Sequence, residues 1–154
     1  MISLQTLHAI CQYNNDFGLS FLNRRIRTLR LYQYEPKMGE ELLWAVKNGD
    51  LDKVRELVER KGCSVNSELM NGRNPLHFAA DYGQLEVLKY LISKGANVNL
   101  PDKHGITPLL AAIYEEHLSC VKLLLSKGAK SDGKTPSGES YKDSAESQEI
   151  KDLL

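Results

Sequence analysis

The chain has 154 residues with 20 basic and 20 acidic side chains, so its formal net charge is zero. This length fits one domain, no apolar run is long enough to cross a membrane, and the first residues lack the basic start and cleavage site of a secretory signal. The cysteines, Cys11, Cys63 and Cys120, are odd in number and far apart, which indicates reduced thiols in the cytoplasm or nucleus rather than a disulfide framework.

Residues 1–37 form an N-terminal extension with a basic character. They carry five basic and two acidic side chains, a balance of +3, which leaves 15 basic and 18 acidic side chains, a balance of −3, for residues 38–154. Leu22, Ile26 and Leu29, with arginines between them, are spaced as on one face of a short basic helix, which would suit a targeting peptide or a membrane-surface anchor. The simpler interpretation, which we favour, is a poorly ordered extension. The mildly acidic remainder argues against nucleic acid as the main partner.

Residues 39–70 are the first of several similar units, each predicted to be a pair of short helices. The same residue types recur 34 positions after Ala45, Gly49 and Leu51, but 33 positions after Gly62, Val65 and Asn66. This change of spacing predicts a one-residue insertion near Arg60. Trp44 occupies the position of Phe78 in the next unit. It is predicted to lie in the core, with a partly exposed anchor for a partner as the alternative.

Residues 71–103 and 104–136 are two complete units with a period of 33 residues. Asn74 and Thr107 are the expected N-caps of the first helix, and each precedes a proline at the first helical position. Gly83 is predicted to end that helix in a left-handed conformation. The apolar face of the second helix is carried, in the first of these units, by Leu85, Leu88, Leu91 and Ile92.

Residues 137–154 form a weak fourth unit, because Gly138 and Ala145 keep the 33-residue phase. Ile150, Leu153 and Leu154 are predicted to cover the last apolar face. A unit of this kind cannot bury its own apolar faces, but it can do so when stacked on its neighbours. A fixed period in this range is typical of stacked-repeat architectures.

The repeating unit resembles the ankyrin repeat, which implies an all-α solenoid of stacked helix-turn-helix units. Two departures from the ankyrin pattern stand out. Leu110 replaces a histidine that bridges neighbouring repeats, and Glu116 replaces a left-handed glycine, at a cost of about 1 kcal/mol. The matching residues are Gly72, Pro75 to His77, Ala79, Ala80, Gly83, Leu91, Gly95, Ala96, Val98 and Asn99, then Gly105, Thr107 to Leu109, Ala112, Leu124, Leu125, Gly128 and Ala129.

Few features of the sequence suggest catalysis. The run from Gly128 to Thr135 fits the G-x-x-x-x-G-K-T pattern, but that pattern binds phosphate between a buried strand and a helix, whereas this run follows a predicted helix. The histidines lack metal-ligand spacing, and His77 is expected to bond to the backbone of the neighbouring repeat. Cys120 lies on an apolar helix face, which is typical of packing. The sequence predicts a protein that is not an enzyme and uses no cofactor or metal.

The expected binding surface of a repeat stack is a concave face made of first-helix residues and turn tips. Tyrosines beside carboxylates on such a face suit a protein partner that presents Arg or Lys. The alternative for each charged residue is an ordinary solvated surface. The candidate partner-binding residues are Trp44, Met70, Asn71, Arg73, Asp81, Tyr82, Asp102, Lys103, His104, Tyr114, Glu115 and Glu116.

Several runs go beyond the general ankyrin pattern and are similar to one subfamily of small ankyrin-repeat proteins, from Met38 to Leu154. They include the run from Lys47 to Asp52 and the run from Pro101 to His104. The resemblance implies a monomer that sequesters the heterodimeric actin-capping protein and so promotes filament growth at barbed ends. It also implies an alternative partner, Rel-family transcription factors in the nucleus. Met70 and Glu116 differ from the subfamily, which has Glu and Gly at these positions.

Overall fold

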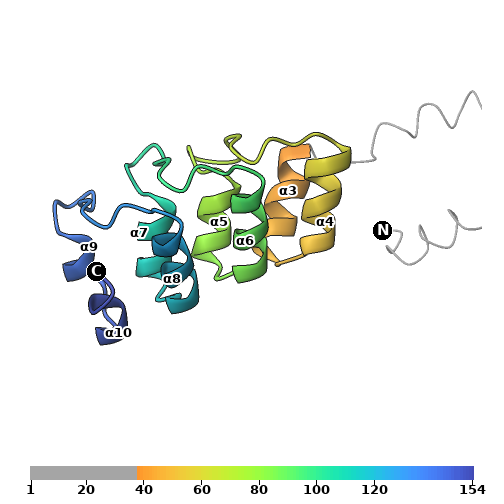
Figure 1. Ribbon diagram of the computed structural model, residues 1–154. Helices are drawn as coiled ribbons and strands as arrows, with labels where there is room; N and C mark the ends of the chain where they lie inside the picture. Colours follow the sequence, from red (N-terminus) through yellow and green to blue (C-terminus); the bar gives the residue numbers. More distant parts are fainter. Residues whose placement is uncertain (1–37) are drawn as a thin grey trace, which may run out of the picture. The chain divides into compact units, whose positions relative to one another are not determined.

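The computed structural model describes residues 38–154, which form short helices in successive pairs. Figure 1 shows the pairs side by side, with the longer loops that link one pair to the next all on the same side. In chain order the elements are α3 (Met38–Lys47), α4 (Leu51–Arg55) continued by the π-helix η2 (Glu56–Arg60), α5 (Pro75–Asp81), α6 (Leu85–Ser93), α7 (Pro108–Tyr114), α8 (Leu118–Ser126), α9 (Tyr141–Ser144) and α10 (Gln148–Lys151).

The predicted all-α stack of helix pairs is confirmed for this part of the chain. Among the described residues, β pairing is confined to two isolated bridges, Met70 with Arg73 and Lys134 with Ser140. None of the helices in residues 38–154 is long and apolar enough to span a membrane. The predicted basic helix around residues 22–30 lies outside the described residues.

The first helices of the two complete repeats begin as the sequence predicts. The Asn74 side chain accepts hydrogen bonds from the backbone N–H groups of Leu76 and His77, and Pro75 is the first helical residue. Thr107 Oγ1 accepts from the Leu110 N–H at 3.2 Å. These caps satisfy N–H groups that have no partner within the helix, so the sequence sets the starting points of α5 and α7.

The turn inside each pair needs a left-handed residue. Gly83 has φ of 66°, and a Cβ at this position would lie 2.8 Å from the His117 ring, so glycine is required for two reasons. In the next repeat Glu116 takes the same left-handed conformation with φ of 57°, the condition under which the sequence predicts a cost. Its carboxylate accepts hydrogen bonds from the N–H groups of Glu146 at 2.8 Å and Ser147 at 3.0 Å. The strained residue therefore ties its own repeat to the last helix pair.

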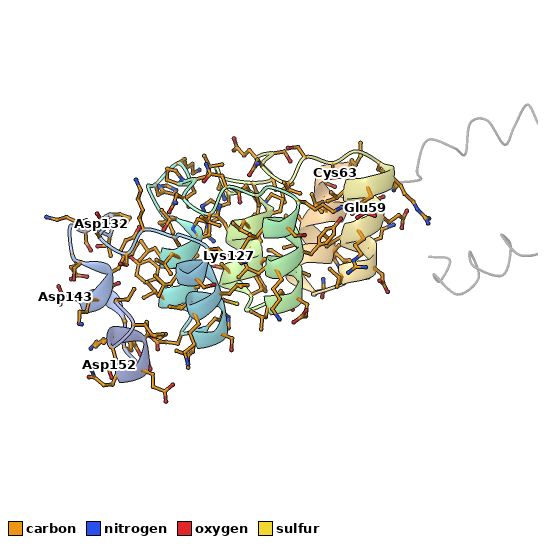
Figure 2. The ribbon with its side chains drawn as sticks, in the orientation of Figure 1. Glu59, Cys63, Lys127, Asp132, Asp143 and Asp152 are labelled. Atoms are coloured by element: carbon orange, nitrogen blue, oxygen red, sulfur yellow. The ribbon has the colours of Figure 1, made fainter. Side chains whose placement is uncertain are left out.

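The first repeat absorbs its extra residue in the π-helix η2, where the sequence predicts an insertion. The Lys61 N–H donates to the Glu56 carbonyl five residues back, at 3.2 Å, which is the hydrogen-bond pattern of a π turn. The Glu59 carboxylate lies 2.9 Å from Lys94 Nζ and so joins the first repeat to the second. Figure 2 shows Glu59 and Cys63 at the end of the stack where α4 lies.

The core runs through the whole described stack. α5 packs between α3 and α7, and α6 packs between α4 and α8. Small residues such as Ala79 and Ala112 are fully buried and let the first helices approach closely, while Leu88, Leu91 and Leu124 fill the space between the second helices. Truncation of one of these leucines to alanine costs about 2–5 kcal/mol in well-packed cores.

The last pair closes the core, since α9 packs on α7 and α10 on α8. Tyr141 and Ile150 are buried, and the Tyr141 hydroxyl lies 3.1 Å from Thr107 Oγ1. Of the three residues predicted to cover the final face, Ile150 is buried and Leu154 packs partly buried against the core. The expectation for Leu153 was wrong, because its side chain is 39% exposed.

Candidate protein-binding surface

The loops between repeats end in tight turns at equivalent positions. The Leu69 N–H donates to the Arg73 carbonyl, the Asp102 N–H to the Ile106 carbonyl, and the Thr135 N–H to the Glu139 carbonyl, all at 2.8 to 2.9 Å. We call these the tip turns. They hold residues 69–73 and 102–106 next to the first helices, and these two ranges contain six of the twelve candidate binding residues.

Asp102 is a structural residue of its tip turn, so the expectation of a partner-facing carboxylate there was wrong. Its side chain is 1% exposed. Oδ1 accepts from the N–H groups of His104 and Ile106, and Oδ2 lies 3.2 Å from Arg73 Nε. Burial alone would raise the pKa of Asp102, but these backbone hydrogen bonds and the Arg73 guanidinium outweigh it and lower the pKa. The Asp102 carboxylate is charged, and both of its oxygens already have partners within the protein.

Arg73 and Asp81 are engaged with each other as well. Arg73 Nη1 lies 3.2 Å from the Asp81 carboxylate, and Arg73 Nε lies 3.2 Å from the Asp102 carboxylate. The Asp81 backbone carbonyl also accepts a hydrogen bond from His117 Nε2 at 3.1 Å. Arg73, Asp81 and Asp102 thus form one ion-pair network within a single repeat, and only part of the Asp81 carboxylate faces solvent.

His77 bridges two repeats, as expected. Its Nδ1 accepts from the Asn74 N–H at 3.3 Å, so Nε2 carries the proton and donates to the Ile106 carbonyl at 2.9 Å. Burial lowers the pKa of His77, which outweighs the opposing effects of the Ile106 carbonyl and Asp102. The imidazole is neutral and structural.

Three aromatic side chains of the first helices remain exposed. Trp44 is 60%, Tyr82 46% and Tyr114 44% exposed. The prediction of a buried Trp44 was wrong, and its stated alternative, an exposed side chain, is what the structure has. Its counterpart Phe78 is covered by the preceding repeat, where Lys47 Nζ lies 5.4 Å from the ring centroid. No repeat precedes α3 within residues 38–154 to cover Trp44 in the same way.

Lys47 contacts one of these exposed aromatic side chains although it is not among the candidate residues. Its Nζ lies 5.0 Å from the Tyr82 ring centroid, close enough for a cation–π interaction. The two residues are 35 positions apart, one period plus the offset of a side chain on the neighbouring helix. This spacing was the signal in the sequence that could have identified Lys47 as a neighbour of Tyr82. Tyr82 is thereby held in place by the first repeat.

Glu115 and Glu116 have different environments despite being adjacent. Glu115 is exposed and has no ion-pair partner within residues 38–154. Both carboxylate oxygens of Glu116 accept hydrogen bonds from N–H groups before α10. The carboxylate is therefore not open for the partner contact that the sequence predicts. Among the carboxylates predicted to meet a partner, Glu115 is the one that is fully available.

The tip turns add a smaller exposed group. Met70 is 42% exposed, and the exposed Asn71 accepts a hydrogen bond from Lys103 Nζ at 3.1 Å. His104 is exposed at the end of its turn. We define the aromatic surface as Trp44, Met70, Tyr82, Tyr114 and Glu115.

The catalytic-looking features of the sequence have structural uses. Thr135, at the end of the phosphate-loop pattern, is buried, and its Oγ1 bonds to Ser137 and accepts from the Glu139 N–H. The pattern follows helix α8 instead of a strand. Cys120 is buried, and burial raises the pKa of its thiol to about 11, so it is a packing residue. The described residues contain no group of three or more His, Cys, Asp or Glu placed to hold a metal.

Known proteins resemble the chain over the same region. A family model of three ankyrin repeats matches residues 42–135. Myotrophin from Xenopus tropicalis is 58% identical over 57 residues, which cover 36% of this chain and 48% of that protein. Myotrophin from Homo sapiens is 58% identical over 45 residues, which cover 29% of this chain and 37% of that protein. The chain spans about half the length of the curated relatives it matches.

The family model covers most of α3, all elements from α4 to α8, and the first two tip turns. Stacked helix pairs of this type form protein-interaction modules. The chain belongs to the ankyrin-repeat family.

Proposed function

We propose that the aromatic surface binds the heterodimeric actin-capping protein and keeps it away from filament barbed ends. The observation that carries this proposal is the exposure of three aromatic side chains on the first helices, Trp44, Tyr82 and Tyr114, together with the open carboxylate of Glu115, which follows Tyr114 in the chain. Similarity to myotrophin in the matched stretch supports the choice of partner.

The chemistry of the surface favours a basic partner. Exposed tyrosine and tryptophan are the side chains most often found at the energetic centre of protein interfaces. Glu115 adds a charge that attracts Arg or Lys, whereas Asp102 and Glu116 are already hydrogen-bonded. A partner bound here would have its basic surface covered, so its capping contact with actin would be blocked sterically. We place this activity in the cytoplasm, with one copy of the chain for each capping protein.

The proposal is tested by actin elongation from barbed ends in the presence of capping protein. We expect the full chain to restore elongation, and Tyr114→Ala or Glu115→Arg to weaken this effect by about tenfold or more. Glu86→Arg is the matched control, since Glu86 is an exposed acid on α6 in a weak surface pair with Lys89.

Two outcomes would contradict the proposal. One is a full chain that leaves capping unaffected at any concentration. The other is equal activity of the Glu115 and Glu86 variants. A chain that instead captured a Rel-family dimer through the same side chains would replace this proposal with the nuclear alternative.

A further inference from the structure

The tip turn before α5 exposes an Asn-Gly pair in an unusual chemical setting. Asn71 is exposed with φ of 58°, and Gly72 follows it. The Gly72 backbone N–H donates to Glu68 Oε1 at 2.7 Å. Lys103 Nζ donates to Asn71 Oδ1 at 3.1 Å. A nitrogen nucleophile, a carboxylate base and a cation therefore surround one side-chain amide.

These groups match the needs of an intramolecular reaction. In an Asn-Gly pair the backbone nitrogen of glycine can attack the asparagine Cγ, because glycine has no Cβ to obstruct the approach. The attack requires loss of the Gly72 N–H proton, and Glu68 lies within the distance needed to accept it. The Lys103 ammonium stabilises the negative charge that develops on Asn71 Oδ1.

We propose that Asn71 is a site of structure-assisted deamidation, with Glu68 as the base and Lys103 as the stabilising cation. The bond from Gly72 N to Asn71 Cγ forms and the Cγ–Nδ2 bond breaks. The proton taken up by Glu68 passes to Nδ2, which leaves as ammonia. Water then opens the resulting succinimide at one or the other carbonyl carbon and gives aspartate or isoaspartate at position 71. No electrons are transferred, and water is the co-reactant.

The product changes the tip turn in a defined way. Either product adds a negative charge next to Met70, which belongs to the aromatic surface, and beside Lys103. Isoaspartate also lengthens the backbone by one carbon. A Cβ at Gly72 would already lie 2.5 Å from the Lys103 backbone nitrogen, so the longer backbone would disturb the contact between the two tip turns.

The chain contains its own control. Asn48 is also exposed and also precedes a glycine, Gly49. There the asparagine Nδ2 donates to the Trp44 carbonyl at 2.8 Å, and the Gly49 N–H donates to the Val46 carbonyl at 3.2 Å. The dipeptide is the same, but its nitrogen faces a carbonyl oxygen, which is a far weaker base than a carboxylate.

The test follows both sites in the full chain during incubation at neutral pH. Peptide mapping by mass spectrometry, with separation of aspartate from isoaspartate, gives the rate at each asparagine. We expect Asn71 to convert faster than Asn48 in the native protein and at a similar rate in denaturant. Equal or reversed rates in the native protein would overturn the proposal.

Two variants test the assigned roles. Glu68→Gln is expected to slow conversion of Asn71 by about tenfold, and Lys103→Met is expected to slow it as well, with Asn48 unaffected in both. Both replaced side chains are exposed, and circular dichroism checks that the fold is kept. A Glu68 variant that converts as fast as the parent chain, or faster, would show that the hydrogen bond protects the turn and would overturn the proposal.

Discussion

The carboxylate of Glu116 accepts a hydrogen bond from the Ser147 N–H at 3.0 Å while its own backbone is held at φ of 57°. The strain lies in one repeat and the benefit in the next. A residue that looks like a defect in the repeat pattern thus holds the C-terminal helix pair in place.

Replacement of Glu116 separates these two effects. Glu116→Ala keeps the left-handed strain and loses both hydrogen bonds, so we expect a loss of about 1–3 kcal/mol in the free energy of unfolding. Glu116→Gly also loses them but relieves about 1 kcal/mol of strain, so its loss is smaller. Urea denaturation measures both values. A glycine variant less stable than the alanine variant would contradict this account.

Arg73→Met should destabilise the protein by leaving Asp102 buried without its cation. Breaking a buried pair in this way costs about 3–5 kcal/mol, and we expect about 2–3 kcal/mol because Arg73 is partly exposed. The pKa of Asp102 should rise toward its ordinary value, because one of the groups that lower it is removed, and carboxyl NMR titration can follow this rise. In the Asp102→Asn background the Arg73 substitution should cost much less, and an equal cost there would rule out the pair as the cause.

His77 predicts a pH dependence of stability. Burial lowers its pKa below the ordinary value near 6.5, so the unfolded chain binds the proton more readily than the native protein. Stability is therefore complete above about pH 6.5 and falls as the pH drops below it, by up to about 1.4 kcal/mol per pH unit. Denaturation between pH 7 and pH 5 measures this slope.

The control for that slope is His77→Gln, which can still donate a hydrogen bond to the Ile106 carbonyl but does not titrate. His104 and His117 are unchanged in this variant, so the difference in slope belongs to His77. The same slope in both proteins would refute the assignment. Asp102 acts in a lower window, because its pKa is lowered and its contribution is lost only as the pH falls below about 4.

Trp44 and Phe78 occupy equivalent positions but should respond differently to truncation. Trp44→Ala should change the free energy of unfolding by less than about 0.5 kcal/mol because the side chain is 60% exposed. Phe78→Ala should cost about 3–5 kcal/mol because that ring is buried. Thermal or urea denaturation of the two variants decides this, and a loss from the Trp44 change as large as that from the Phe78 change would contradict the prediction.

The fold was predictable because a repeat constrains itself. Glycines, prolines and alanines at a fixed period specify turns, helix starts and close packing in each unit. Because the same pattern occurs in a second unit, each assignment is supported twice. The insertion in the first repeat was predictable for the same reason. Its π-helical form was not, since spacing counts residues but does not say which hydrogen bonds accommodate the additional one.

The binding surface was only partly predictable. Spacing places Asp102 and Glu116 correctly, but whether a carboxylate faces solvent depends on backbone N–H groups in loops and neighbouring repeats. For Asp102 a signal existed, because an Asp three residues before a turn glycine is typical of a side chain that bonds to its own turn. For Glu116 the partner N–H groups are about 30 residues away in a unit with weak periodicity, and the sequence offered no comparable signal.

The π turn in the first repeat has a consequence for how this chain can vary. One residue added to an ordinary α-helix would rotate everything after it by about 100°, and Val65 and Asn66 would then no longer meet the second repeat. Because η2 takes up the added residue within a single turn, Asn66 still bonds to the Gly95 carbonyl at 3.0 Å. The first repeat therefore carries its one extra residue without any compensating change downstream.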